Sequence, residues 1–209
     1  MGNNVTTIGT EAFKDCSNLE YIKLQDTVTL IKDSAFKNTK LSTLLYDGSM
    51  MSWDSGGGQF EDCPSFKYIE LDEGITTIPQ NMFKNSGLEY IEIPYTVTSI
   101  GNEAFNSCAR LDMIYCTNTT APALGSNVFS FINSSVIVVV PYGSTGYNSW
   151  SNVTIRELLP FDPSGGILIQ NSAGTTYKVN YTSSTFGIAI LGMTAEYYSG
   201  NPASNETID

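Results

Sequence analysis

The chain has 209 residues, of which 41% are hydrophobic and 15% are charged, and its formal net charge is −11. This length can bury a real hydrophobic core, and the acidic balance excludes nucleic acid as a partner because phosphate backbones would be repelled. The sequence contains no histidine, so it has neither a Ser-His or Cys-His nucleophile pair nor an ordinary zinc site. We therefore expect no enzymatic activity, no metal and no cofactor.

A phenylalanine recurs along most of the chain at intervals of 22 to 24 residues, and these positions are Phe13, Phe36, Phe60, Phe83, Phe105 and Phe129. Eight or nine residues after each phenylalanine lies an apolar residue within an alternating segment, which predicts one short strand in every repeat. A period near 23 falls within the range of about 20–29 residues that is typical of leucine-rich repeats. The spacing predicts a solenoid of six coils over residues 5–158, with the phenylalanines stacked in one buried column.

The third repeat departs from this pattern. Its upstream segment, residues 47–59, lacks the V-T-x-I signature that opens the first, second and fifth repeats in full and the fourth repeat in a close variant. Trp53 is expected to fill the missing apolar volume, and Gly56–Gly58 to form a flexible loop tip.

Three of the four cysteines occupy one column of the repeat, since Cys16, Cys63 and Cys108 each follow a repeat phenylalanine by three residues. Residues two coils apart are separated by roughly 10 Å, whereas a disulfide needs Cα atoms closer than about 7 Å. We expect free thiols in this column, and no bond between Cys108 and Cys116 within their coil. The column suits a small buried residue that bonds weakly to the turn backbone.

The outward-facing strand positions form the candidate binding site. Alternation along each strand sends the residues flanking the inward apolar position to the opposite face of the sheet. Among them are six tyrosine and glutamate residues that we take as partner-binding candidates, namely Tyr21, Tyr68, Glu70, Tyr90, Glu92 and Tyr115. Three stacked tyrosines beside an acidic column would make a binding strip, because tyrosine offers a large rigid contact area with a polar tip. The alternative is that these rings only stabilise the sheet by cross-strand stacking.

Glu70 and Glu92 also invite a catalytic interpretation, because neighbouring coils would place these two carboxylates about 5 Å apart, as in retaining glycosidases. A flat ladder without a pocket would not raise the pKa of one carboxyl enough to make it an acid. We favour two solvated like charges.

The last part of the chain changes character. Residues 159–166 are rich in Pro and Gly and predict a boundary between a solenoid with a closing cap, residues 1–158, and a small β appendage or further module, residues 159–209. Residues 167–181 alternate on both sides of a turn and predict a β-hairpin, and residues 186–198 predict a further strand. Ile137 and Val139 place apolar side chains on the outward face of the sixth coil. We expect the appendage or a second subunit to cover them, with Trp150 as a further cap.

The pattern V-T-x-I-G-x-x-A-F-x-x-C-x-x-L-x-x-I, best seen from Val5 and from Val97, resembles the BspA-type leucine-rich repeat of bacterial surface proteins. The segment VVPYGSTGYNSW, which ends at Trp150, resembles the closing coil of such arrays. The resemblance implies a right-handed leucine-rich-repeat solenoid, mostly β with short helical turns.

The same resemblance implies a non-catalytic binding or adhesion module that recognises a protein or glycan at the bacterial cell surface or outside the cell. The chain shows neither a signal peptide nor a membrane-spanning run, so it would be a fragment without its signal peptide. The alternative is a structural or assembly component, such as a virion or fibre protein, with the repeats as a rigid spacer. Oligomerisation or further domains would involve the C-terminal segment.

Overall fold

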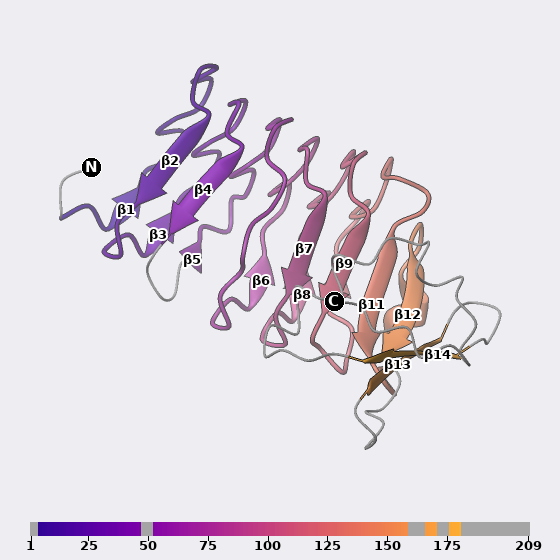
Figure 1. Ribbon diagram of the computed structural model, residues 1–209. Coiled ribbons are helices and arrows are strands. Elements are labelled where there is room, and N and C mark those ends of the chain that lie inside the picture. Colours follow the sequence, from indigo (N-terminus) through magenta and orange to yellow (C-terminus); the bar gives the residue numbers. More distant parts are fainter. Residues whose placement is uncertain (1–3, 47–51, 159–165, 171–175, 181–209) are drawn as a thin grey trace.

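The computed structural model describes residues 4–46 and 52–158 in full and the backbone of residues 166–170 and 176–180. The described chain winds into a solenoid whose coils lie side by side (Figure 1). One row of strands, from the N-terminal end, is β2 (Tyr21–Leu24), β4 (Thr43–Tyr46), β7 (Tyr90–Ile93), β9 (Met113–Cys116), β11 (Ile137–Pro141) and β12 (Thr154–Leu158). We call the outward side of this row the strand face.

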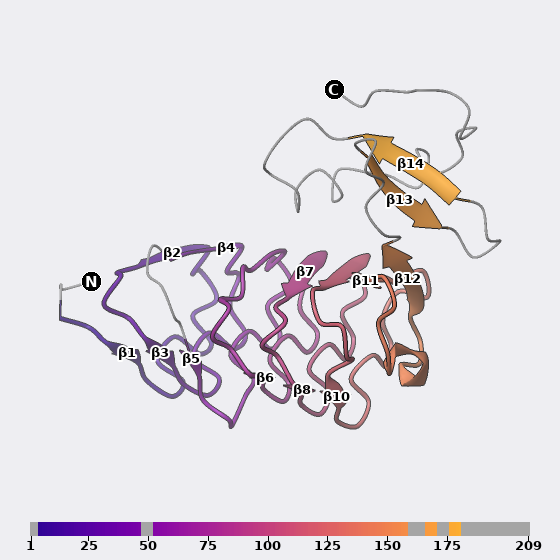
Figure 2. The same cartoon turned by 90° about the horizontal axis from the view of Figure 1, so that it is seen from below.

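A second row of two-residue strands lies on another side of the coils (Figure 2). It consists of β1 (Thr7–Ile8), β3 (Leu30–Ile31), β5 (Ser52–Trp53), β6 (Thr77–Ile78), β8 (Ser99–Ile100) and β10 (Ala123–Leu124). Paired neighbours within both rows are parallel, as successive turns of one solenoid require. Among the described residues the only helix is a 3₁₀ turn, η1 (Tyr147–Ser149).

The predicted phenylalanine column is confirmed. Neighbouring rings from Phe13 to Phe129 stack nearly parallel, with centroids 5.3–5.9 Å apart. The four middle rings are fully buried, whereas Phe13 at the first coil is half-buried because no described coil covers its outer face. The column is therefore the continuous apolar axis of the solenoid, and each ring contributes about 0.5–1.5 kcal/mol per aromatic contact beyond its burial.

The turns that carry this column are not helical, contrary to the expectation of short helical turns. The residues two before and two after each phenylalanine all have positive φ values of 52–70°. They are Glu11, Asp15, Ser34, Asn38, Gly58, Asp62, Asn81, Asn85, Glu103, Ser107, Asn127 and Phe131. Asn, Asp and Gly tolerate this left-handed conformation better than other residues, so the polar composition of the repeat suits it.

These turns form a hydrogen-bonded ladder of their own. Each of the five junctions between coils has three such hydrogen bonds, 2.8–3.2 Å long. Their donors are the N–H groups of the phenylalanine, of the residue two positions before it and of the residue two positions after it, and their acceptors are carbonyls of the next coil. Thus Glu11, Phe13 and Asp15 donate to Asp33, Ala35 and Lys37. Since a buried backbone group without a partner is costly, this ladder is what allows the coil to turn sharply beside an apolar column.

The cysteine column follows the expectation. All four cysteines are free thiols, and Cys63, Cys108 and Cys116 are buried whereas Cys16 in the first coil is exposed. Cys63 donates to the Phe36 carbonyl and Cys108 to the Phe83 carbonyl, each over 3.0 Å. The thiols therefore bond to the turn backbone of the preceding coil, as small buried residues in this column were expected to do.

The third coil interrupts both rows of strands. The long row is split because residues 67–71 form no strand between β4 and β7, as the ribbon without an arrow shows in Figure 1. The short row divides between β5 and β6. The turn ladder and the phenylalanine column nevertheless continue through this coil without a gap.

Extra aromatic packing compensates for the interruption. Trp53 meets Phe60 edge-on at 5.8 Å, so it fills the apolar volume as expected. Phe66 stacks on Phe60 at 4.3 Å. Gly56–Gly58 is not the flexible loop tip that we expected, because Gly57 and Gly58 are buried in the solenoid wall. A Cβ at Gly57 would lie 1.8 Å from the Gln80 carbonyl oxygen, so the close contact between coils requires glycine there.

Trp150 of the closing coil ends the phenylalanine column at the C-terminal side of the array. Trp150 lies 5.2 Å from Phe129 and ends the ring column, which confirms its predicted role. β12 pairs along the whole of β11, so β11 is not the terminal strand, and the edge beside Ile137 and Val139 is covered within residues 1–158. The outward side chain of Val139 is buried and that of Ile137 is half-buried. The expectation that the appendage or a second subunit covers this outward face stays a prediction.

The predicted hairpin is confirmed as β13 (Gly166–Gln170) and β14 (Thr176–Asn180), which pair antiparallel. β13 continues the sheet through a bridge between Leu158 and Ile169. The strand expected over residues 186–198 and most of the linker lie outside the described residues. The domain boundary after residue 158 stays a prediction.

Candidate functional site

The candidate residues lie on the strand face, as the alternation predicts. Each follows or precedes an inward side chain that is buried in the core, such as Ile22, Ile91 or Ile114. Their exposure differs along the array. Tyr21 and Tyr68 are 54% and 50% exposed, Glu70 is exposed, and Tyr90, Glu92 and Tyr115 are half-buried. The face therefore presents its aromatic and acidic groups most openly over the first three coils.

Two of the tyrosines form a stacked pair. The rings of Tyr68 and Tyr90 lie 5.8 Å apart with an angle of 7° between their planes. The expected stack of three is wrong, because Tyr21 lies two coils from Tyr68 and the coil between them carries Thr43 in this column. Tyr115 occupies the other column, where it lies opposite Glu92 across the β7–β9 pair. The structure thus leaves Tyr21 apart and gathers the other five candidates, Tyr68, Glu70, Tyr90, Glu92 and Tyr115.

The electrostatics of this cluster reflect partial burial and its own negative charge. Burial, together with Glu70 and Glu73, raises the pKa of the Glu92 carboxyl above its ordinary value. Burial also raises the pKa of the Tyr68, Tyr90 and Tyr115 hydroxyls, with Glu92 adding to each shift. The tyrosines are therefore neutral hydrogen-bond donors at physiological pH. The Glu70 carboxylate is exposed, as expected for a solvated charge, whereas Glu92 is half-buried and therefore less solvated than we expected.

A groove of about 430 Å³ opens beside Tyr68, between β4 and residues 67–71 of the third coil. Its walls include Leu45 and Tyr46 on one side and Lys67, Tyr68 and Glu70 on the other. Sequence reasoning did not include Leu45, Tyr46 or Lys67 among the site residues. The irregular third repeat could have indicated these residues, because the groove opens at the coil where the sequence departs from the repeat pattern.

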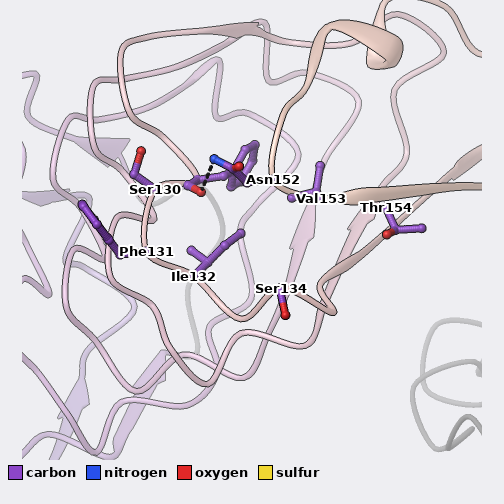
Figure 3. A pocket seen from close by; sticks show the side chains of 8 residues that line it. Ser130, Phe131, Ile132, Ser134, Asn152, Val153 and Thr154 are labelled. Carbon is purple, nitrogen blue, oxygen red and sulfur yellow. Dashed lines mark hydrogen bonds between the residues drawn. The ribbon is translucent and has the colours of Figure 1, made fainter.

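A second hollow, of about 550 Å³, lies at the C-terminal end of the turns (Figure 3). It is lined by Ser130, Phe131, Ile132, Ser134, Asn152, Val153 and Thr154 together with Phe129. Asn152 donates to the Phe129 carbonyl over 3.1 Å and so joins the closing coil to the sixth coil. Its lining includes no charged side chain and none of the predicted site residues.

The described part of the chain holds no group of three or more His, Cys, Asp or Glu residues suited to a metal ion. Within the same residues, no helix is long and apolar enough to cross a membrane.

Comparisons with known proteins agree with this architecture. Among solved structures, a leucine-rich repeat protein from Eubacterium ventriosum ATCC 27560 superposes with a TM-score of 0.53 and 19% sequence identity. The likeness covers 74% of this chain and 54% of the other, so this chain spans about half the length of that protein, and it speaks for the fold alone. A comparison with curated proteins gave no match.

A family description of the BspA-type leucine-rich repeat region, six copies long, matches residues 1–112 and again residues 54–156. The two matches together span most of the chain and coincide with the coils of the solenoid. The chain belongs to the BspA-type leucine-rich repeat family.

Proposed function

We propose that the solenoid is a non-catalytic binding module that recognises a protein or glycan partner through its strand face. The observation that carries this proposal is the stacked pair of Tyr68 and Tyr90, with Glu70 and Glu92 in the neighbouring column. Rigid aromatic groups with polar tips are enriched where proteins bind partners, and a half-exposed ring offers apolar area at low entropic cost.

A place at the cell surface or outside the cell is part of the same proposal, because BspA-type repeat proteins are typically bacterial surface or secreted proteins. A virion or fibre spacer finds no support in the comparisons, which match a repeat family and a bacterial repeat protein.

The test is a screen of the full chain against glycan and bacterial or host protein arrays, followed by affinity measurements with paired variants. Replacing Tyr68 and Tyr90 by alanine removes the stacked pair. Replacing Tyr95 and Tyr142, which are 59% and 58% exposed, is the matched control. Loss of two central aromatic contacts should weaken binding by about 30-fold or more, while the control pair should bind like the unmodified chain.

The proposal is wrong if partners found on the arrays bind both double variants equally, with melting temperatures showing that both are folded. A screen that yields no partner of either class would count against it as well.

A further inference from the structure

The long strand row contains an internal edge. β4 pairs with β2 on one side, over four register positions from Tyr21–Thr43 to Leu24–Tyr46. On its other side no strand pairing joins it to residues 67–71, and among the described residues no backbone hydrogen bond crosses from this segment to β4. A strand with one unpaired edge presents a row of N–H and C=O groups that can pair with another chain.

The side chains on the inner side of β4 are less buried than those of the other strands, which is consistent with an opening at this edge. In every other strand of the row from β2 to β9, the two inward side chains are buried, as Ile91 and Ile93 are in β7. The inward side chains of β4, Leu44 and Tyr46, are only half-buried. The groove therefore reaches past the surface of the sheet to its inner side at this one coil.

Tyr46 lines the groove and carries a polar group without a partner. The Tyr46 hydroxyl is shielded from solvent and makes no hydrogen bond among the described residues. Leaving such a group unsatisfied is unfavourable, so a ligand that bonds to it gains more than a bond exchanged with water would give. Nothing of this kind occurs at the inward positions of β7 or β9, which carry apolar side chains or the Cys116 thiol.

The chemistry of the groove walls favours one class of occupant. Leu45 and Tyr68 are exposed apolar surfaces, 42% and 50% accessible, on the two sides. Glu70 is exposed, and no ion pair of its carboxylate occurs among the described residues, whereas Lys67 is paired with Glu89 at 2.9 Å. The free charge of the groove is thus negative. An extended segment that alternates basic and apolar side chains matches both the strand edge and its walls.

We propose that the partner's recognition element is an extended, basic peptide segment that adds as a strand to the open edge of β4. This inference rests on the proposed function and deepens it, since it names the chemistry that the strand face takes. The backbone of the peptide pairs with β4, its apolar side chains contact Leu45 and Tyr68, and its basic side chains approach Glu70.

The experiment titrates the full chain with an acetylated, amidated peptide of alternating lysine and valine, followed by calorimetry and by amide chemical shifts. Two peptides of the same length serve as controls. One has glutamate in place of lysine, and the other has N-methylated amides along one edge, which removes the ladder donors without changing charge. The expected result is binding of the first peptide, with shifts confined to β4 and residues 67–71, and affinity at least about tenfold weaker for both controls.

Variants of the protein separate this inference from a general attraction between charges. Glu70→Lys should weaken binding about fivefold, whereas Glu20→Lys, an exposed change in the first coil, should have no effect. Tyr46→Phe should weaken binding while leaving the thermal stability unchanged or raised, because it removes an unsatisfied hydroxyl. A purely structural role for that hydroxyl would lower stability instead.

The inference is overturned if the lysine–valine peptide does not bind, if N-methylation has no effect, or if both glutamate variants behave alike. It is also overturned if the β4 amides of the free protein exchange as slowly as those of β7, since a second copy or another part of the chain would then occupy the edge. None of these variants alters Tyr68 or Tyr90. The proposed function can therefore stand through the array experiment even if the peptide experiment fails.

Discussion

The phenylalanine column should stabilise the solenoid most strongly at its middle, and Phe105→Ala tests this. Phe105 is fully buried, and its ring lies 5.5 Å from Phe83 and 5.7 Å from Phe129. Truncation loses the burial of the ring and both stacking contacts, and leaves a cavity. The turn ladder fixes the spacing of the coils, so the neighbouring rings have little freedom to close that cavity. We expect a loss of about 4 kcal/mol in the free energy of unfolding.

Phe13→Ala is the internal control. Phe13 is half-buried and has one ring neighbour, Phe36 at 5.3 Å, so the same substitution should cost about 1–2 kcal/mol. Urea unfolding followed by circular dichroism gives both values, and the slope shows whether the array still unfolds as one unit. Equal losses for the two variants, at unchanged slope, would refute the idea that burial within a continuous column determines stability.

Four further outcomes follow from the described coils. Gly57→Ala should prevent folding or lower the melting temperature sharply, because the new Cβ would lie 1.8 Å from the Gln80 carbonyl oxygen. Gly143→Ala is the control, since a Cβ at that position has no atom within 4 Å, and it should lower the melting temperature far less in the same thermal scan. Trp150→Ala should cost about 3 kcal/mol in urea unfolding by uncovering Phe129, and a loss below about 1 kcal/mol would show that the column is capped elsewhere. In thiol labelling of the native protein followed by mass spectrometry, exposed Cys16 should react first and the three buried thiols only on unfolding. Without reductant, a mass lower than that of the fully reduced chain by two or four hydrogens would reveal a disulfide instead. Burial raises the pKa of the Cys108 thiol from 9.0 to about 11 and that of the Cys116 thiol to about 12. Unfolding therefore releases thiol protons above pH 9, so the free energy of unfolding should fall as the pH rises from 9 towards 12. A variant with both cysteines changed to alanine should show a flatter decline of this free energy with pH, and an unchanged decline would contradict this origin.

The sequence was sufficient for the repeat because its signal is periodic. Six phenylalanines at near-constant spacing can be buried together only in stacked coils, and the alternating segments after them can only face one way. The cysteine column followed from the same spacing. Where the period weakens, the inference weakens too: Gly56–Gly58 looked like a loop tip because three glycines in a row carry no periodic signal, although Gly57 and Gly58 form part of the solenoid wall.

The stack of Tyr68 on Tyr90 was predicted, but Tyr21 was wrongly included, although the sequence already places Thr43 in this column in the coil between Tyr21 and Tyr68. Another feature of the site depends on a relation between coils that a single repeat does not encode. The open edge of β4 arises where two adjacent segments fail to pair. Pairing is set by the register of both segments, so neither sequence alone reveals its loss. The left-handed turn residues were missed because a helical turn and a left-handed turn place the phenylalanine on the same buried side.

Hydrogen exchange of the full chain, with and without a partner obtained from the arrays, tests most directly whether the strand face is the binding surface. We expect the partner to slow exchange in β4, residues 67–71, β7 and β9, and to leave exchange in the turns around Phe131 unchanged. Slower exchange confined to those turns or to the short strand row, with none on the strand face, would contradict it.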